Sequence, residues 1–190
     1  MKNVIIIGGG AAGLTAARTA AERGFNVTVV ERNERPARKV MITGKGRCNV
    51  TNDTDVNGLV SAVTDKKSGR FLYSAFNAYS AEDTKEFFET YGVPLKTERG
   101  NRVFPCSDKA VDIVDALVAA AKQAGAELMT DRAVSLKTED GRVTGVVTES
   151  GRTLFADAVV VATGGLSYPL TGSTGDGYEL AASVGHTVTE

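Results

Sequence analysis

The sequence predicts an α/β fold in which a Rossmann-like parallel sheet is followed by a small antiparallel β-meander. Three patterns lead to this expectation. Two continuous apolar runs, residues 4–7 and 158–162, are typical of strands buried inside a parallel sheet. A glycine-rich turn joins the first run to an Ala-rich stretch. Alternating apolar and polar residues between positions 134 and 148 indicate a hairpin.

The composition suits one domain with a sizeable core. The chain has 190 residues, of which 42% are apolar, and 22 Lys and Arg residues nearly balance 23 Asp and Glu residues. We therefore expect a single domain over residues 1–190. The formal net charge of −1 provides no global attraction for nucleic acid or an anionic membrane, so we expect neither as a partner.

The chain shows no targeting, membrane or metal-binding signal. No apolar run approaches the roughly 18 residues of a membrane helix, and the apolar start breaks at once into glycines. These patterns predict a cytoplasmic protein. Cys48 and Cys106 lie too far apart for a CxxC motif, and His186 is the only histidine, so the sequence argues against a metal site.

The first thirty residues predict a strand, a helix and a second strand. The strand at 4–7 leads through the glycine turn into a helix over 14–23, which Gly24 ends. The next strand covers 26–30 and finishes at Glu31. Such a βαβ unit has parallel strands and a right-handed crossover.

The rest of the chain alternates between loops, helices and short strands. Residues 32–52 are basic and predict a long functional loop. Ser80 and Asp83 predict the start of a helix that runs to about Tyr91, and Ser107 precedes a second amphipathic helix near 108–124. A third parallel strand at 127–130, a hairpin turning at Asp140-Gly141, the apolar strand 158–162 and a short helix near 176–184 complete the prediction.

The turn after the first strand carries the G-x-G-x-x-G pattern of dinucleotide-binding folds. Its glycines permit a tight turn, close approach of a pyrophosphate and close packing of the helix, while an acid near the end of the second strand accepts ribose hydroxyls. Free N–H groups at the helix N-terminus would then hold the phosphates. The alternative is a tight turn without a ligand. The residues expected to contact the cofactor here are Gly8, Gly10, Ala11, Ala12, Gly13 and Glu31.

The fingerprint alone does not separate NAD from FAD, because both contain an ADP moiety. The apolar run at 158–162 ends in a second glycine pair, which would lie at the carboxyl edge of the sheet, where ligands of open sheets bind. The alternative is a flexible exit from a core strand. The cofactor residues expected at this edge are Ala162, Thr163, Gly164 and Gly165.

Three longer motifs carry a family resemblance. They are Lys-Gly-Arg-Cys-Asn-Val-Thr-Asn at 45–52, Gly-Asn-Arg-Val-Phe-Pro at 100–105 and the segment from Ala-Thr-Gly-Gly at 162–165 to Gly-Asp-Gly at 175–177. Together they resemble the bacterial flavoprotein family of aminoacetone oxidases and BaiN-type NAD(P)/FAD-dependent oxidoreductases, over essentially the whole chain. The resemblance implies a noncovalent FAD in a Rossmann-like domain. It also implies an inserted substrate-side domain and a final FAD-contacting segment, so we expect this chain to be an amino-terminal portion that retains FAD weakly by itself.

The resemblance also implies cofactor contacts outside the glycine turn. The residues concerned are Arg32, Lys39, Gly46, Arg47, Cys48 and Asn49. Other interpretations stay open, since the basic loop is also explained as a solvated face and Cys48 as a buried, unreactive thiol. The sequence Pro36-Ala37-Arg38-Lys39 departs from the family, because a glycine is expected before the basic pair. Arg38 and Lys39 would hold either the pyrophosphate or another domain.

The expected function is that of an FAD-dependent oxidoreductase. It would transfer a hydride or two electrons between a small organic substrate and the flavin, which oxygen or a transiently bound NAD(P)H would reset. Two alternatives remain, an NAD-binding dehydrogenase domain and a non-enzymatic dinucleotide-binding module. The sequence assigns no catalytic residue, and His186 is more typical of a structural histidine. Substrate identity and oligomeric state stay open.

Overall fold

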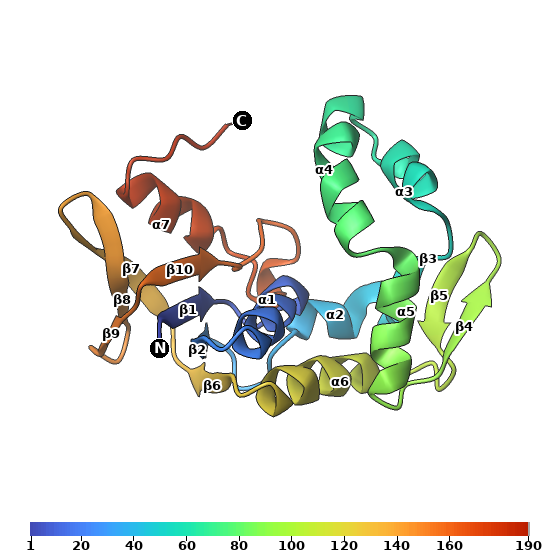
Figure 1. Cartoon of the computed structure of the whole chain (residues 1–190), viewed down its shortest axis with the longest axis horizontal. Coiled ribbons are helices and arrows are strands. Elements are labelled where there is room, and N and C mark those ends of the chain that lie inside the picture. Colours follow the sequence, from blue (N-terminus) through green and yellow to red (C-terminus); the bar gives the residue numbers. More distant parts are fainter. Residues whose placement is uncertain (190) are drawn as a thin grey trace. The chain divides into compact units, whose positions relative to one another are not determined.

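The computed structural model describes residues 1–189, which group into two compact units (Figure 1). Unit 1 contains Met1–Val40 and the chain from Leu117 onward, and unit 2 contains Met41–Ala116. The expectation of one domain over residues 1–190 stays a prediction. Among the helices formed by residues 1–189, none combines the length and the apolar character that crossing a membrane requires.

Unit 1 is built on a four-stranded parallel sheet with strand order β10-β1-β2-β6 (Figure 1). Val4 pairs with Ala158 on one side and with Val27 on the other, so the first apolar run lies inside the sheet. The structure confirms the predicted α/β fold class and all four parallel strands. Their bounds are β1 (Asn3–Ile7), β2 (Asn26–Glu31), β6 (Glu127–Thr130) and β10 (Ala158–Val161).

The prediction that the second apolar run is a buried strand is wrong. Val160 is 38% exposed and Val161 is 41% exposed, whereas Ile6 at the centre of β1 is fully buried. The difference follows from position, because β10 is an edge strand that pairs with β1 alone. Apolar composition reports the tendency to be buried, and it does not report whether a neighbour lies on both sides.

Three helical segments belong to unit 1 alone. They are α1 (Ala11–Glu22), the 3-10 helix η2 (Pro169–Thr171) and α7 (Asp176–Ser183). Helix α1 begins at Ala11, three residues earlier than predicted, and turns Gly13, Leu14 and Ala17 toward the core. It ends before Gly24, whose φ of +82° is the left-handed conformation that glycine adopts most easily.

The predicted meander is a three-stranded antiparallel sheet of order β7-β8-β9. Its strands are β7 (Ala133–Glu139), β8 (Arg142–Thr148) and β9 (Thr153–Phe155). Asp140 and Gly141 both have positive φ at the β7–β8 turn, as a two-residue hairpin turn requires. One apolar cluster joins this meander to the parallel sheet and to α7. Its buried members are Ile5, Ile7, Val30, Ala133, Val146 and Leu180.

Unit 2 contains a small antiparallel sheet of order β3-β5-β4, with strands β3 (Thr51–Asn52), β4 (Leu95–Glu98) and β5 (Arg102–Pro105). Its own helices are the 3-10 helix η1 (Thr43–Gly46), α3 (Val56–Ala62), α4 (Lys66–Ala78) and α5 (Ala81–Thr90). Helices α2 (Arg38–Ile42) and α6 (Ala110–Gln123) each run from one unit into the other.

The predicted long loop over residues 32–52 is partly wrong, because it contains α2, η1 and β3. These elements are too short to show a periodic apolar pattern. The predicted helix after Ser80 is confirmed, with reciprocal hydrogen bonds between Ser80 and Asp83 at its start. Helices α3 and α4 were not predicted. Their signal was available in Asp55 and Asp65, whose carboxylates accept from the first-turn N–H groups.

Candidate functional site

The glycines of the β1–α1 turn have three different surroundings. Gly8 has a φ of +105°, and a Cβ added there would lie 2.6 Å from the carbonyl oxygen of Ala162. A Cβ on Gly13 would collide with the carbonyl oxygen of Gly8, so the helix packs directly on the turn. A Cβ on Gly10 would meet no atom within 4 Å. The backbone at Gly10 is therefore open to a ligand while its neighbours are closed by the protein itself.

Helix α1 presents an uncapped N-terminus at this opening. Its N-cap residue, Gly10, has no side chain that could accept a hydrogen bond, and its first turn holds no acidic residue. The N–H groups of Ala11, Ala12 and Gly13 have no acceptor within the helix, because they belong to its first turn. Ala11 and Ala12 are exposed. These N–H groups and the positive end of the helix dipole form a setting that suits a phosphate group.

The carboxylate of Glu31 lies directly beside the turn. Its Oε2 accepts from the Gly9 N–H at 2.6 Å, and its Oε1 accepts from the backbone and side-chain nitrogens of Asn33 at 2.8 and 2.6 Å. A carboxylate offers about four acceptor positions, so about one remains for a ribose hydroxyl. Asn33 was not predicted from the sequence. Its signal was its place two residues after Glu31, because Asn side chains often form hydrogen bonds with groups nearby in the sequence. Arg38 donates to Asn33 Oδ1 at 2.9 Å.

The end of β10 lies against the glycine turn. The Ala162 N–H donates to the carbonyl of Ile7 at 2.8 Å, and the Gly8 backbone approaches both Ala162 and Thr163. Gly164 has a φ of +77°, and a Cβ there would lie 3.1 Å from the hydroxyl of buried Ser173. The structure therefore brings the residues predicted from the turn and from 162–165 together at the carboxyl edge of one sheet.

The side chains of Arg32 and Lys39 contact the segment that follows Gly165. Arg32 Nη1 donates to Thr174 Oγ1 at 2.8 Å and pairs with Asp176 at 3.2 Å. Lys39 Nζ donates to Ser167 Oγ at 3.1 Å. Their predicted contacts with the cofactor stay predictions, because in this structure both cations contact the protein.

Asp176 also receives a hydrogen bond from Arg132 Nε at 3.0 Å. Burial acts to raise the pKa of Asp176, but hydrogen bonds from Thr174 and Arg132 outweigh burial and lower the pKa. Asp176 is therefore an anion at neutral pH. Arg132 was missed by the sequence analysis, because its partner lies 44 residues away in the sequence.

Within unit 2, Arg47 holds the loop that carries Gly46, Cys48 and Asn49. Arg47 pairs with Glu98 at 2.9 Å and with Asp108 at 3.2 Å, and its guanidinium carbon lies 4.1 Å from the centre of the Phe104 ring. The hydrogen bond with Glu98 is the main cause that raises the pKa of Arg47. Lys45, Gly46 and Cys48 all have positive φ, so these contacts fix an irregular backbone. The predicted cofactor contacts of Gly46 and Arg47 stay predictions.

Cys48 and Asn49 point toward protein groups within unit 2. Cys48 is buried, and burial raises the pKa of its thiol against a weaker opposing hydrogen bond with Thr43. A thiol with a raised pKa is a poor nucleophile at neutral pH. The amide of Asn49 faces the carbonyls of Thr51 and Val103, which its nitrogen reaches at 3.0 and 3.2 Å. Neither residue shows the surroundings of a catalytic group.

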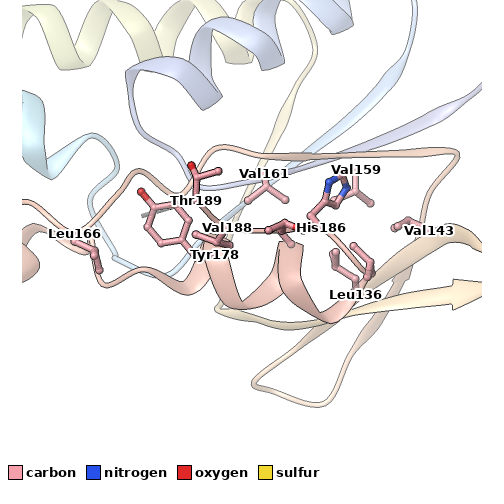
Figure 2. Close-up of a pocket in the computed structure, with 12 residues that line it drawn as sticks. Leu136, Val143, Val159, Val161, Leu166, Tyr178, His186, Val188 and Thr189 are labelled. Carbon is pink, nitrogen blue, oxygen red and sulfur yellow. The ribbon is translucent and has the colours of Figure 1, made fainter. Parts of the chain in front are cut away.

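An apolar pocket of about 820 Å³ lies beside β10 and α7, within unit 1. Figure 2 shows the side chains of Val159, Val161 and His186 along it, with Tyr178 near Leu166. None of the residues predicted to contact the cofactor lines this pocket. His186 therefore lines a pocket to which the glycine turn does not contribute. Residues 1–189 contain no group of three or more side chains that could hold a metal ion.

Comparisons with known proteins agree with this geometry. The family model described as HI0933-like protein Rossmann domain matches residues 2–190. The 3-dehydro-bile acid delta(4,6)-reductase of Clostridium scindens is 32% identical over 191 residues, which cover 99% of this chain and 45% of that protein. The ribosomal RNA dihydrouridine synthase of Escherichia coli strain K12 is 30% identical over 187 residues, which cover 98% of this chain and 45% of that protein.

Among solved structures, the open conformation of a flavocytochrome c3 fumarate reductase superposes with a TM-score of 0.67. It is 24% identical, with 98% of this chain and 41% of that chain covered, and supports the fold alone. The chain spans less than half the length of the curated relatives named here. The match over residues 2–190 confirms the resemblance stated from the sequence motifs: the chain belongs to the HI0933-like family, and this segment is its Rossmann domain.

Proposed function

We propose that this chain binds FAD and is the flavin-binding part of an oxidoreductase that acts on a small organic substrate. The observation that carries the proposal is the glycine turn: open backbone at Gly10, an uncapped helix N-terminus, and the Glu31 carboxylate 2.6 Å from the Gly9 nitrogen. A tight turn without a ligand needs glycine at positions 8 and 13 but gives no reason for glycine at position 10, where φ is −79° and a Cβ would meet no atom.

Each half of the site has a task in this proposal. The N–H groups of Ala11 and Ala12 bind the pyrophosphate, and Glu31 accepts from the adenosine ribose. Gly164 and Gly165 follow β10 at the same edge of the sheet, along which the rest of the dinucleotide would lie. When bound, FAD supplies a ring system that accepts or gives a hydride, and the chain contributes binding and orientation. FAD is favoured over NAD by the family motifs at 45–52 and 162–177.

The relatives support a narrower substrate class. One is named for reducing the delta(4,6) positions of a 3-dehydro bile acid, and another for making dihydrouridine in ribosomal RNA. Both names describe the loss of a carbon–carbon double bond in conjugation with a carbonyl group. A carbonyl stabilises the negative charge that develops when a hydride adds to such a bond. We therefore propose a conjugated carbon–carbon double bond as the reacting group. Its reduction oxidises the flavin and requires NAD(P)H to reduce it again, whereas oxygen would be the second partner only if the reaction ran toward formation of the double bond.

The expected absence of a nucleic-acid partner bears on this proposal. The absence of a nucleic-acid partner was expected from bulk charge alone, and a relative named for ribosomal RNA leaves that expectation unsupported. An assay should therefore test two substrates, a free conjugated ketone and an RNA that contains uridine.

The cytoplasmic location stays a prediction.

The test is to identify the cofactor carried by the protein isolated with any sequence that follows residue 190. Released FAD in a near-stoichiometric amount, together with reduction of one of the two substrates by the reduced protein, would support the proposal. Colourless protein that does not take up added FAD would overturn it. Binding of NADH without FAD would favour a dehydrogenase domain, and a reducible flavin with no turnover would favour a non-enzymatic module.

A further inference from the structure

Arg32, the residue that follows Glu31, is held by a closed ring of polar contacts. Its Nη1 donates to Thr174 Oγ1 at 2.8 Å and to Asp176 Oδ2 at 3.2 Å. The Thr174 hydroxyl in turn donates to Asp176 Oδ1 at 2.6 Å. The side chain of Asp176 is 17% exposed, so solvent screens these contacts less than those of an open surface pair. Arg32, Thr174, Asp176 and Arg132 are called the Asp176 clamp below.

Arg132 supplies the second cation of the Asp176 clamp. Its Nε donates to Asp176 Oδ2 at 3.0 Å, the same oxygen that Arg32 contacts. Glu149 is a more distant partner of Arg132, at 3.6 Å, and its side chain is 65% exposed. One shielded carboxylate is therefore shared by two guanidinium groups that follow the carboxyl ends of β2 and β6.

The Asp176 clamp matters because of what Arg32 would otherwise do. In dinucleotide-binding folds, an acid at the end of the second strand binds an unmodified ribose, whereas an arginine nearby accommodates a 2′-phosphate. Here both residue types are adjacent in the sequence, at positions 31 and 32. Glu31 turns toward Gly9 and Asn33, and Arg32 turns toward Thr174 and Asp176.

We propose that Asp176 is a positioning residue that determines nucleotide specificity: by holding Arg32, it makes the site accept an adenine nucleotide with a free ribose 2′-hydroxyl and reject a 2′-phosphate. The inference rests on the proposed dinucleotide site. Such selection would keep NADP(H) out of a site built for FAD.

Removal of the Asp176 charge should strengthen the binding of a nucleotide that carries a 2′-phosphate. Without the Asp176 carboxylate, Arg32 loses its anionic partner and Arg132 keeps only the more exposed Glu149. The positive charge left at Arg32 then attracts a different anion. A 2′-phosphate is an anion that Arg32 can contact with paired hydrogen bonds. A purely structural role for Asp176 predicts the opposite, an equal loss for every nucleotide. The difference between 5′-ADP and 2′,5′-ADP therefore separates the two roles.

The experiment is calorimetric titration of the nucleotide-free protein, isolated with any sequence that follows residue 190, with 5′-ADP and with 2′,5′-ADP. The wild-type chain should bind 5′-ADP more tightly than 2′,5′-ADP. Asp176→Asn should bind 2′,5′-ADP about tenfold more tightly than the wild type, the usual value of a hydrogen bond to a charged group, with little change for 5′-ADP. Glu149→Gln, which removes only the outer partner of Arg132, should leave both affinities unchanged. The double variant Asp176→Asn with Arg32→Gln should lose the gain.

Several results would overturn the proposal. One is a folded Asp176→Asn variant that binds 5′-ADP but gains nothing for 2′,5′-ADP, and another is a gain that persists without Arg32. Equal weakening of both nucleotides would assign Asp176 a structural role. If Asp176→Asn does not fold, Asp176→Ser is the second variant and is judged by the same criteria. A wild-type chain that binds neither nucleotide would overturn the proposed dinucleotide site, and this inference with it.

Discussion

At the scale of single residues, the glycine turn shows how one residue type serves different purposes within six positions. Gly8 and Gly13 are required by the protein, because a side chain at either would meet backbone atoms. Gly10 is different, since its φ of −79° and ψ of −175° are open to any residue and its surroundings are empty. The fold therefore gives no reason for glycine at this position, whereas the proposed pyrophosphate would.

Gly10→Ala separates ligand binding from folding. We expect a stability within about 0.5 kcal/mol of the wild type, as for substitutions that meet no neighbour. FAD affinity should fall by about tenfold or more, because the added methyl group would keep the phosphate from the N–H groups at the start of α1, with which it would form charged hydrogen bonds. Thermal unfolding and FAD fluorescence titration measure the two effects. Gly13→Ala is the matched control, and overpacking there should cost about 1–3 kcal/mol of stability. Unchanged FAD affinity in Gly10→Ala would contradict the phosphate site.

Glu31→Ala tests the adenosine end. We expect FAD binding to weaken by about 1–3 kcal/mol, because a charged hydrogen-bond acceptor is lost and the Gly9 N–H loses its partner. Glu34→Ala, an exposed acid three residues later, is the control for the change in net charge. Equilibrium titration with FAD gives both values. Equal affinity in the Glu31 and Glu34 variants would remove Glu31 from the site.

The sequence could predict the glycine turn and Glu31 because their spacing is local and repeats in many folds. It could not predict the surroundings of Arg32. The partner Asp176 lies 144 residues away, and only the parallel pairing of β10 with β1 brings its segment near β2. The family resemblance implied a cofactor contact for Arg47, which stays a prediction. The sequence could not show that Glu98 and Asp108 pair with its guanidinium group.

At the scale of elements, short polar contacts set where strands and helices begin and end. Ser80 and Asp83 form the capping box that begins α5, and these residues predicted the helix from sequence. Asp131, between β6 and β7, plays a similar part for strands. Its carboxylate accepts from Ser150 of the β8–β9 turn and from the Arg132 N–H. One side chain thus joins the parallel sheet to the meander.

The Asp131 contacts predict a pH dependence of stability. Hydrogen bonds, the first from the Ser150 hydroxyl, lower the pKa of Asp131 from 3.8 to about 2. A carboxyl group with a lower pKa in the folded state stabilises that state above pH 3.8, and the contribution is lost as pH falls toward 2. The difference in urea midpoint between the wild type and Asp131→Asn should therefore shrink between pH 5 and pH 2. Asp140→Asn in the β7–β8 turn is the control, and a constant difference for Asp131→Asn would refute the assignment.

At the scale of the whole molecule, the α/β class was predictable because the parallel strands, the glycine turn and the β7–β8 hairpin each have a local signal. The grouping into two compact units was not predictable, since it depends on contacts between residues far apart in the sequence. The edge position of β10 is of the same kind. Composition made residues 158–162 a buried strand, and only the strand order reveals that one side is open.

The open side of β10 predicts association of the isolated chain. An edge strand with exposed Val160 and Val161 offers unpaired backbone groups and apolar surface to a second molecule. Val160→Lys should reduce concentration-dependent association, because charged edge residues oppose edge-to-edge pairing. Sedimentation velocity over a range of concentrations measures the change, and thermal unfolding checks that the fold survives. The same degree of association in both proteins would show that this edge is not the contact.

The two cysteines give unit 2 a reporter of its own opening. Cys106 is exposed, whereas Cys48 is buried. Cys48 also has a positive φ, and burial raises the pKa of its thiol. A colorimetric thiol reagent should therefore modify one sulfur at once and the second only as fast as unit 2 opens. Cys106→Ser would isolate the slow reaction. Its rate would then measure how often the loop that carries Arg47 and Cys48 opens. Immediate modification of Cys48 in the folded protein would contradict its burial.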